Sequence, residues 1–323
     1  MKRSSVKLKP DEAETHEAET HPMKIKILLA LALSLTIQAA FAEKLAITFD
    51  DLPLNGSLPQ GMTEVDIVER VLPILKKTQG PPVYGFINAS QLEGNPKGAE
   101  ALKLWVRGGQ RVGSHTYSHR DLTRSSVEEF RREILLNEPA LQLLSSKDEW
   151  RWFRYPYLHE GDTLEKRHAV RQLLGELKYS IAQVTLDHED YMWNSVYARC
   201  VDKKDRKAIE WLRKSYLETA EAYFELQRAE AQQVYGRQIN HVLLLHLGAF
   251  SPEILPPLFD LLKRKGFSLV SLEEAQQDPA YGVDPDFAAT NTGTLLEQHM
   301  DARKLPYAPV REKPRKELAA ICN

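Results

Sequence analysis

The stretch KLAITFDDLP, residues 44–53, combines a short apolar run with two adjacent carboxylates. The apolar run predicts a buried strand over residues 44–49. Asp50 and Asp51 follow this strand directly. Neighbouring residues of an extended chain point to opposite sides, so the two carboxylates can take different roles. Alone, such a pair is more often a solvated turn or a helix cap than a site.

Short apolar runs recur along the rest of the chain and alternate with amphipathic stretches. The further runs that read as strands are 83–87, 110–114, 150–154, 179–185, 241–247 and 267–271. Helical spacing of apolar residues is found over 63–77, 97–107, 125–144, 163–175 and 252–265. This alternation is typical of parallel βα units, arranged either as an open sheet or as a closed barrel.

Polar residues stand at the carboxyl ends of several predicted strands, where βα barrels carry their chemistry. Asp50 and Asp51 follow the first predicted strand. At the ends of later predicted strands stand His115, Arg154, Asp187, Asp190 and His246. His119 follows His115 by four residues. This spacing suits two ligands of one metal ion, but surface or core histidines show it as well. From its position alone, His246 reads as a core histidine rather than as a catalytic one.

The composition is that of an ordinary globular protein. The chain has 323 residues, of which 42% are apolar and 27% charged, with a formal net charge of −2. This length suits one large α/β domain or two smaller ones. The balanced charge gives no electrostatic case for nucleic acid as a partner.

Residues 202–238 are highly charged and contain no glycine or proline before Gly236. They predict one long helix or a helical hairpin, inserted at about 195–238 between the fifth and sixth strands. The insertion either covers the strand that ends at His246 or packs away from it. After residue 278 the pattern weakens, so we expect a domain over 43–278. Residues 279–323 are then a tail that wraps this domain or lacks order in part.

The N-terminal region predicts export from the cytoplasm. Residues 24–42 contain two lysines, an apolar run over 27–37 and the sequence Ala40-Phe41-Ala42. This is the pattern of a signal peptide cleaved after Ala42, and its apolar run is too short to span a membrane. We therefore expect a periplasmic or secreted protein with no stable membrane insertion after cleavage. Translation is expected to start at Met23, with Met1 as the alternative.

Two cysteines remain after such cleavage, Cys200 and Cys322. In an oxidising compartment they can pair, and free thiols are the alternative reading.

Five short motifs give the chain a specific resemblance. In order they are TFDD at 48–51, HTYSH at 115–119, RYPY at 154–157, DHEDY at 187–191 and LLH at 244–246. Over residues 44–275 the chain resembles the polysaccharide deacetylase family (NodB homology, carbohydrate esterase family four). The resemblance implies an α/β fold, a distorted (β/α) barrel of the NodB-homology type.

The resemblance also implies roles for individual residues. Asp51, His115 and His119 would bind Zn²⁺ or another divalent transition metal, which leaves a position open for water. Asp50 would act as general base with Arg154 against it, an arrangement that orients the carboxylate and depresses its pKa. His246 would be the general acid, supported by Asp190. The backbone N–H of Tyr157 would stabilise the oxyanion, and the substrate-binding candidates are Tyr157, Pro156 and Trp193.

The chain departs from the family pattern at a few positions. Leu52 stands where glycine is usual, which makes a positive φ unfavourable there. Tyr155 lies between the arginine and the proline of the third motif, and Tyr191 replaces a tryptophan in the fourth. No ligand, base or acid is lost, but the lining of the groove changes.

The leading hypothesis is a metal-dependent hydrolase that removes N-acetyl groups from peptidoglycan or a chitin-type oligosaccharide. An acetylated glycan would then be its partner. An alternative is an O-acetyl esterase on xylan or another glycan, or a small-amide deacylase, with the same site. A non-catalytic glycan binder is the third possibility.

Overall fold

The structure is a computed structural model that describes residues 43–145 and 148–323. The expected signal peptide, its cleavage site after Ala42 and both candidate start codons lie outside these residues. No helix in the described part of the chain is both long and apolar enough to cross a membrane.

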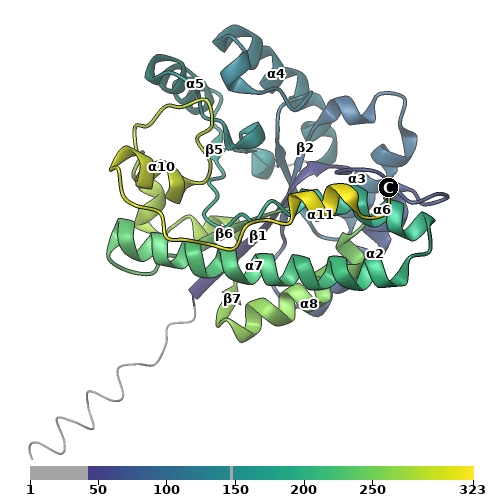
Figure 1. Cartoon of the computed structure of the whole chain (residues 1–323). Coiled ribbons are helices and arrows are strands. Elements are labelled where there is room, and N and C mark those ends of the chain that lie inside the picture. The colour runs from purple at the N-terminus through teal and green to yellow at the C-terminus, as the bar shows by residue number, and fades with distance from the viewer. Residues whose placement is uncertain (1–42, 146–147) are drawn as a thin grey trace, which may run out of the picture. The chain divides into compact units, whose positions relative to one another are not determined.

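A curled parallel sheet forms the centre of the domain (Figure 1). Its strands are β1 (Glu43–Leu52), β2 (Tyr84–Ile87), β3 (Arg111–Ser114), β4 (Trp152–Phe153), β5 (Ser180–Ile181), β6 (His241–His246) and β7 (Phe267–Leu269). The strand order is β5-β4-β3-β2-β1-β6, and β7 pairs with the first three residues of β1. Every predicted strand is present, and only β1 extends beyond its predicted range.

The two ends of the sheet approach each other beyond β5. Leu186 forms a bridge to Leu243 of β6, with hydrogen bonds from Leu186 N to Val242 O and from Leu244 N to Leu186 O, both 3.0 Å. The sheet therefore curls toward closure, although β4 and β5 are only two residues long. This arrangement confirms the expected distorted (β/α) barrel.

The helices that follow the strands surround the sheet, and all but the last and shortest match predicted segments. They are α2 (Glu64–Lys77), α3 (Pro96–Arg107), α4 (Val127–Leu144), α5 (Leu164–Glu176), α8 (Ser251–Arg264) and α9 (Leu272–Ala275). Short 3₁₀ turns occur at Ala89–Leu92, Leu122–Arg124, Asp148–Trp150, Pro156–Leu158 and Pro279–Gly282. Capping boxes at Thr63 and Ser126 fix the starts of α2 and α4. Their apolar faces join Phe49 and Trp105, whose rings meet edge to face, in the core.

The predicted helical insertion consists of the end of α6 (Tyr191–Asp202) and one long helix, α7 (Arg206–Tyr235). The side chain of Asp205 caps the start of α7, and Gly236, with φ of 70°, ends it in the left-handed conformation that glycine favours. α7 packs against α6, α8 and α10 (Leu295–Ala302). In Figure 1 it runs along the lower front of the domain.

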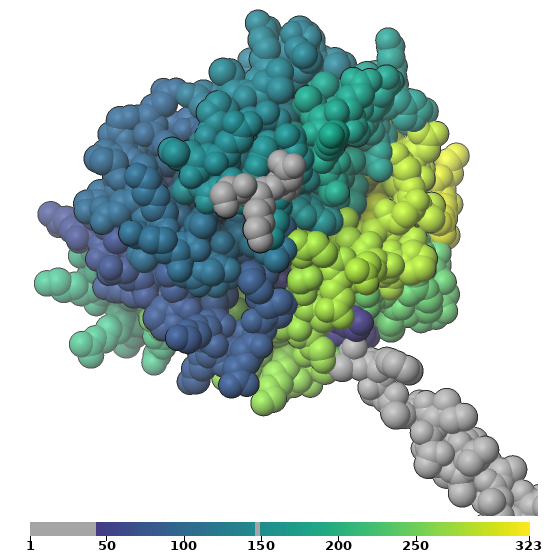
Figure 2. Space-filling view, turned by 180° about the vertical axis from the view of Figure 1, so that it is seen from behind, coloured from purple at the N-terminus to yellow at the C-terminus, as the bar shows by residue number. Residues whose placement is uncertain are grey.

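The C-terminal segment 279–323 is part of the described structure and wraps the domain. It contains α10 and α11 (Arg315–Ala320), and α11 lies across α6 (Figure 1). Seen from behind, its yellow-green beginning lies against the blue and teal segments (Figure 2). An ion pair of 2.6 Å between Arg167 and Asp284 ties it to α5 there.

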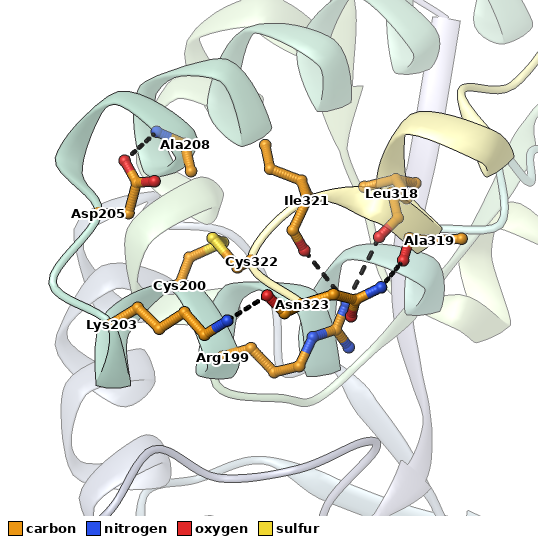
Figure 3. Close-up of a disulfide and its surroundings, with 10 residues drawn as sticks. All are labelled: Arg199, Cys200, Lys203, Asp205, Ala208, Leu318, Ala319, Ile321, Cys322 and Asn323. Carbon is orange, nitrogen blue, oxygen red and sulfur yellow. Dashed lines mark hydrogen bonds between the residues drawn. A yellow bond between two sulfur atoms is a disulfide. The ribbon is translucent and has the colours of Figure 1, made fainter.

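Cys200 of α6 and Cys322 form a disulfide, with their Cα atoms 5.2 Å apart (Figure 3). The guanidinium of Arg199 donates hydrogen bonds to the carbonyl oxygens of Leu318 and Ile321, both at 3.4 Å. The pairing that the sequence left open is therefore present, and it fixes the end of the chain to α6.

Candidate active site

Most of the polar residues at the strand ends line one cleft of about 750 Å³, whereas Arg154 and Asp190 do not line it. This volume lies within the range of sites that bind small molecules. Asp50 and Asp51 come from the end of β1, His115 and His119 follow β3, and His246 ends β6. Parallel strands bring their carboxyl ends to the same edge of a sheet, which explains how residues so distant in sequence share one cleft.

Asp51, His115 and His119 form a group whose potential ligand atoms all lie within 4.8 Å of one another. Oδ1 of Asp51 is 3.5 Å from Nε2 of His115 and 3.3 Å from Nε2 of His119. Burial lowers the pKa of each of these two histidines to about 4. Both rings are therefore neutral at neutral pH, as metal ligands must be.

Two further contacts test whether this group fits a metal ion. Nδ1 of His115 lies 2.8 Å from the carbonyl oxygen of Arg154, so it carries the proton and leaves Nε2 free as a ligand. Oδ1 of Asp51 is buried and has no hydrogen-bond partner among the described residues. An unpaired carboxylate oxygen facing two imidazole nitrogens is costly alone and is satisfied by a cation. The three residues therefore fit a divalent transition metal.

Asn55 orients Asp51 from the other side, because its Nδ2 donates to Oδ2 of Asp51 at 2.8 Å. Nδ2 of Asn194 donates in turn to Oδ1 of Asn55 at 3.0 Å. Asn55 was not predicted as a site residue, although it stands only four residues after Asp51.

Asp50 lies next to the metal-binding group and is almost completely buried. Arg154, also buried, places Nη1 at 3.1 and 3.2 Å from the two oxygens of Asp50. Arg154 is itself fixed by donating to Ala182 O (2.7 Å) and Thr48 Oγ1 (3.1 Å). Burial raises the pKa of Asp50 and outweighs the opposing effect of Arg154. Arg154 thus lowers the pKa of Asp50 as expected, but burial makes the net shift upward.

His246, which lines the cleft, forms a second charged pair with Asp190. Nδ1 of His246 is 2.7 Å from Oδ1 of Asp190, and the backbone N–H of His246 donates to Oδ2 at 2.8 Å. Burial alone would lower the pKa of His246, but Asp190, Asp51 and Asp50 together raise it to about 9. His246 is thus protonated at neutral pH, with Nε2 available to the cleft.

The loop that carries Tyr157 forms the next part of the wall. Tyr157 has φ of 60° and its ring lies 4.4 Å from that of His119. Its backbone N–H stands at the start of a 3₁₀ turn, where helical N–H groups lack intrahelical partners. Asp51 and His119 also have positive φ values, 61° and 57°. Such strained conformations cluster at functional sites.

Leu52 departs from the family pattern without taking a positive φ, since Asp51 adopts that conformation instead. The Leu52 side chain is buried over Gly85 of β2, where any Cβ would lie 2.2 Å from Leu52 Cδ2. Gly85 thus makes room for the leucine.

Two predicted substrate-binding residues lie elsewhere. Trp193 is fully buried, and its indole N–H donates to Ser215 Oγ of α7 at 3.0 Å. Two residues along a helix point to nearly opposite sides, so Tyr191 faces the cleft and Trp193 faces the core. Pro156 is also buried and does not line the cleft. The assignment of Trp193 and Pro156 as substrate contacts was therefore wrong.

The long inserted helix supports the cleft without lining it. No residue of α7, all of which the structure describes, is among the lining residues. Gln227 of α7 donates to Asp187 O at 2.9 Å and accepts from Asp187 N at 3.0 Å. Asp187 lines the cleft, and burial raises its pKa to about 6. The insertion therefore packs away from the cleft opening and does not cover the site.

Comparison with known proteins gives matches to one family. The polysaccharide deacetylase family model matches residues 39–182. A chitin deacetylase from Arthroderma benhamiae is 28% identical over 147 residues, which are 46% of this chain and 35% of that protein. The chain thus spans about a third of the length of this curated relative.

Solved structures share the fold. A pseudoenzyme of the CE4 family from Bacillus anthracis aligns with a TM-score of 0.50 and 16% identity, over 73% of this chain and 66% of that one. A mutant of it with restored enzymatic activity aligns with a TM-score of 0.50 and 18% identity, over 73% and 68%. The family match over the first half of the barrel and the shared fold agree with the resemblance of the five motifs to the polysaccharide deacetylase family of the NodB-homology type.

Proposed function

We propose that the protein is a metal-dependent hydrolase that removes N-acetyl groups from a glycan of the peptidoglycan or chitin type. The observation that carries this proposal is that one cleft holds both a general base beside a metal-binding group and a general acid. Asp50 lies beside the metal-binding group of Asp51, His115 and His119, and His246 with Asp190 faces the same space.

A divalent transition metal held by Asp51, His115 and His119 would polarise the acetyl carbonyl and make a water molecule more acidic. Asp50 accepts the proton of the attacking water, and Arg154 keeps its carboxylate oriented. The N–H of Tyr157 donates to the carbonyl oxygen as negative charge develops on it. His246 then donates its Nε2 proton to the nitrogen, the C–N bond breaks, and acetate and a free amine result.

The protonation of His246 favours an amide over an ester as the bond that is cleaved. An amine leaves poorly unless its nitrogen is protonated, whereas an ester oxygen depends less on an acid. With a pKa raised to about 9, His246 carries the required proton at neutral pH. O-acetyl esterase activity would therefore depend less on Asp190 than deacetylation of an amide.

The fold alone does not imply catalysis, since one solved structural neighbour is described as a pseudoenzyme. In this chain every ligand, base and acid position is occupied by a residue able to perform its role. This supports an active enzyme over a non-catalytic glycan binder.

We also propose that the protein is exported, to the periplasm or outside the cell. The disulfide between Cys200 and Cys322 is consistent with an oxidising compartment. Residues 43–278 would be the catalytic domain and 279–323 a tail attached to it.

The test is acetate release by the purified protein from acetylated chitooligosaccharides and from peptidoglycan, with and without a chelator. We expect release that stops on chelation and returns with Zn²⁺. Asp50→Asn should remove nearly all of it while leaving glycan affinity intact. If no acetylated glycan yields metal-dependent acetate, the proposal is wrong; if glycans bind without turnover, the protein is a binder.

A further inference from the structure

The C-terminal tail supplies part of the cleft wall. Among the lining residues are Thr292, Glu297, Asp301, Tyr307 and Lys313. None of them lies within residues 39–182, which the family model matches, or within the motifs that carry the catalytic roles. The part of the cleft they form is therefore a property of this chain's own tail.

Tyr307 is the most distinctive of these residues. The residue is 46% exposed, while its hydroxyl donates to Asp301 Oδ1 at 2.8 Å and to Glu297 O at 3.3 Å. The hydroxyl thus holds the ring in one orientation and leaves it open toward solvent. Tyr157 and Tyr191, at 56% and 43%, are also large exposed side chains that line this cleft. Single exposed aromatic residues are common on protein surfaces, but three exposed tyrosines in one cleft indicate a binding surface.

The tail is fixed on both sides of Tyr307. Before it, Arg303 donates to Val234 O of α7 at 2.6 Å, and Gln233 of α7 donates to Pro306 O at 3.3 Å. After it, Lys313 forms an ion pair of 2.9 Å with Glu189. The segment that carries Tyr307 is thus fixed to α7 before it and to Glu189 after it.

Contacts at the two ends of the tail strengthen this placement. At its beginning, Thr292 Oγ1 donates to Leu158 O at 2.5 Å, in the loop that carries Tyr157. At its end, the disulfide joins Cys322 to Cys200, and Arg199 holds the last turn of α11 (Figure 3). A wall organised before the ligand arrives costs less ordering entropy on binding.

We propose that Tyr307, with the carboxylates of Asp301 and Glu297, forms a subsite for a second sugar ring of the glycan, next to the ring that carries the acetyl group. This subsite rests on the proposed function. The C–H face of a pyranose is apolar and packs on an aromatic ring, while its hydroxyls donate to carboxylates. The cleft volume of about 750 Å³ leaves room for more than one ring.

The test compares chain lengths. kcat and KM are measured for wild type and Tyr307→Ala with the methyl glycoside of N-acetylglucosamine and with acetylated chitooligosaccharides of two to five sugars. Dissociation constants for the pentamer are measured by calorimetry in an Asp50→Asn background. We expect Tyr307→Ala to lower kcat/KM for the longer oligomers about tenfold through KM, with kcat and the single-ring substrate unaffected. The affinity for the pentamer should fall by a similar factor.

Two variants serve as controls. Tyr307→Phe keeps the ring and should retain most of the affinity. Leu136→Ala, at a side chain of α4 that is 56% exposed and outside the cleft, should change nothing. Equal kinetics of Tyr307→Ala and wild type at every length would overturn the subsite while leaving the proposed function intact. An equal loss on the single-ring substrate would also overturn it. If wild type releases no acetate at all, the function fails, and the pentamer affinities still decide on the subsite.

Discussion

Both carboxylate oxygens of Asp190 form hydrogen bonds with His246, one with Nδ1 of the ring at 2.7 Å and one with the backbone N–H at 2.8 Å. This contact orients the ring and also favours its protonated form. Asp190 makes the largest contribution among the carboxylates that raise the pKa of His246 to about 9 against the effect of burial.

The pH dependence of deacetylation should follow His246. The acid must be protonated, so the rate should fall as the pH rises through about 9. Asp190→Asn removes the main charge that raises this pKa, so the alkaline limb should move toward the ordinary histidine value of about 6.5. The amide rate should fall more than the rate on an O-acetyl ester. An alkaline limb that stays in place in Asp190→Asn would exclude His246 as its source.

The same pair predicts a pH dependence of folding stability. A histidine with a raised pKa stabilises the folded state fully below its unfolded pKa of about 6.5, and this contribution is lost as the pH rises through about 9. Melting temperatures of wild type and Asp190→Asn should therefore differ most near pH 6 and converge near pH 10. A constant difference across this range would contradict the assignment.

Asn55 should control metal affinity without touching the metal. It donates to Oδ2 of Asp51, and loss of such an orienting contact typically weakens metal binding by about 10- to 100-fold. Titration of the metal-free protein with Zn²⁺ should show this loss in Asn55→Ala. Asn291→Ala, a change at another asparagine of the cleft wall, should bind Zn²⁺ as wild type does.

Gln227 should support the cleft from α7. Its amide makes two hydrogen bonds to the backbone of Asp187, and its removal leaves those buried groups unpaired. Gln227→Ala should cost about 1–3 kcal/mol of the free energy of unfolding. It should also lower kcat, because Asp187 and Asp190 share one loop. Gln232→Ala, at an exposed position of the same helix, is the matched control. Equal stability of the two variants would show that α7 does not hold this loop.

The disulfide should hold the tail in the cleft wall. Its removal in Cys322→Ser should lower the free energy of unfolding by about 2–4 kcal/mol. Turnover of longer oligomers should also fall more than turnover of a single-ring substrate. Reductant should have the same effect on wild type and none on a variant that lacks both cysteines. If reductant leaves wild-type stability and length preference unchanged, the disulfide does not fix the tail.

The sequence predicted parallel βα units because its strands are short apolar runs separated by amphipathic helices, a pattern that depends on local residues only. The choice of a barrel over an open sheet came from the family resemblance. The candidate metal ligands and the Asp50–Arg154 contact were implied by the family resemblance of the motifs in which they stand. The tail was not, because Tyr307 and Lys313 enter the cleft through long-range contacts with α7 and Glu189 that leave no local pattern. Trp193 was misplaced because the start of α6 at Tyr191 decides which residues face the cleft.

The central claim is that this cleft hydrolyses an acetamide with a metal and Asp50. The most direct measurement is acetate released from acetylated chitopentaose by metal-free protein, by protein reconstituted with Zn²⁺, and by reconstituted Asp50→Asn. We expect multiple turnovers only for the reconstituted wild type. Equal acetate release by metal-free and reconstituted protein, or by Asp50→Asn, would contradict the account.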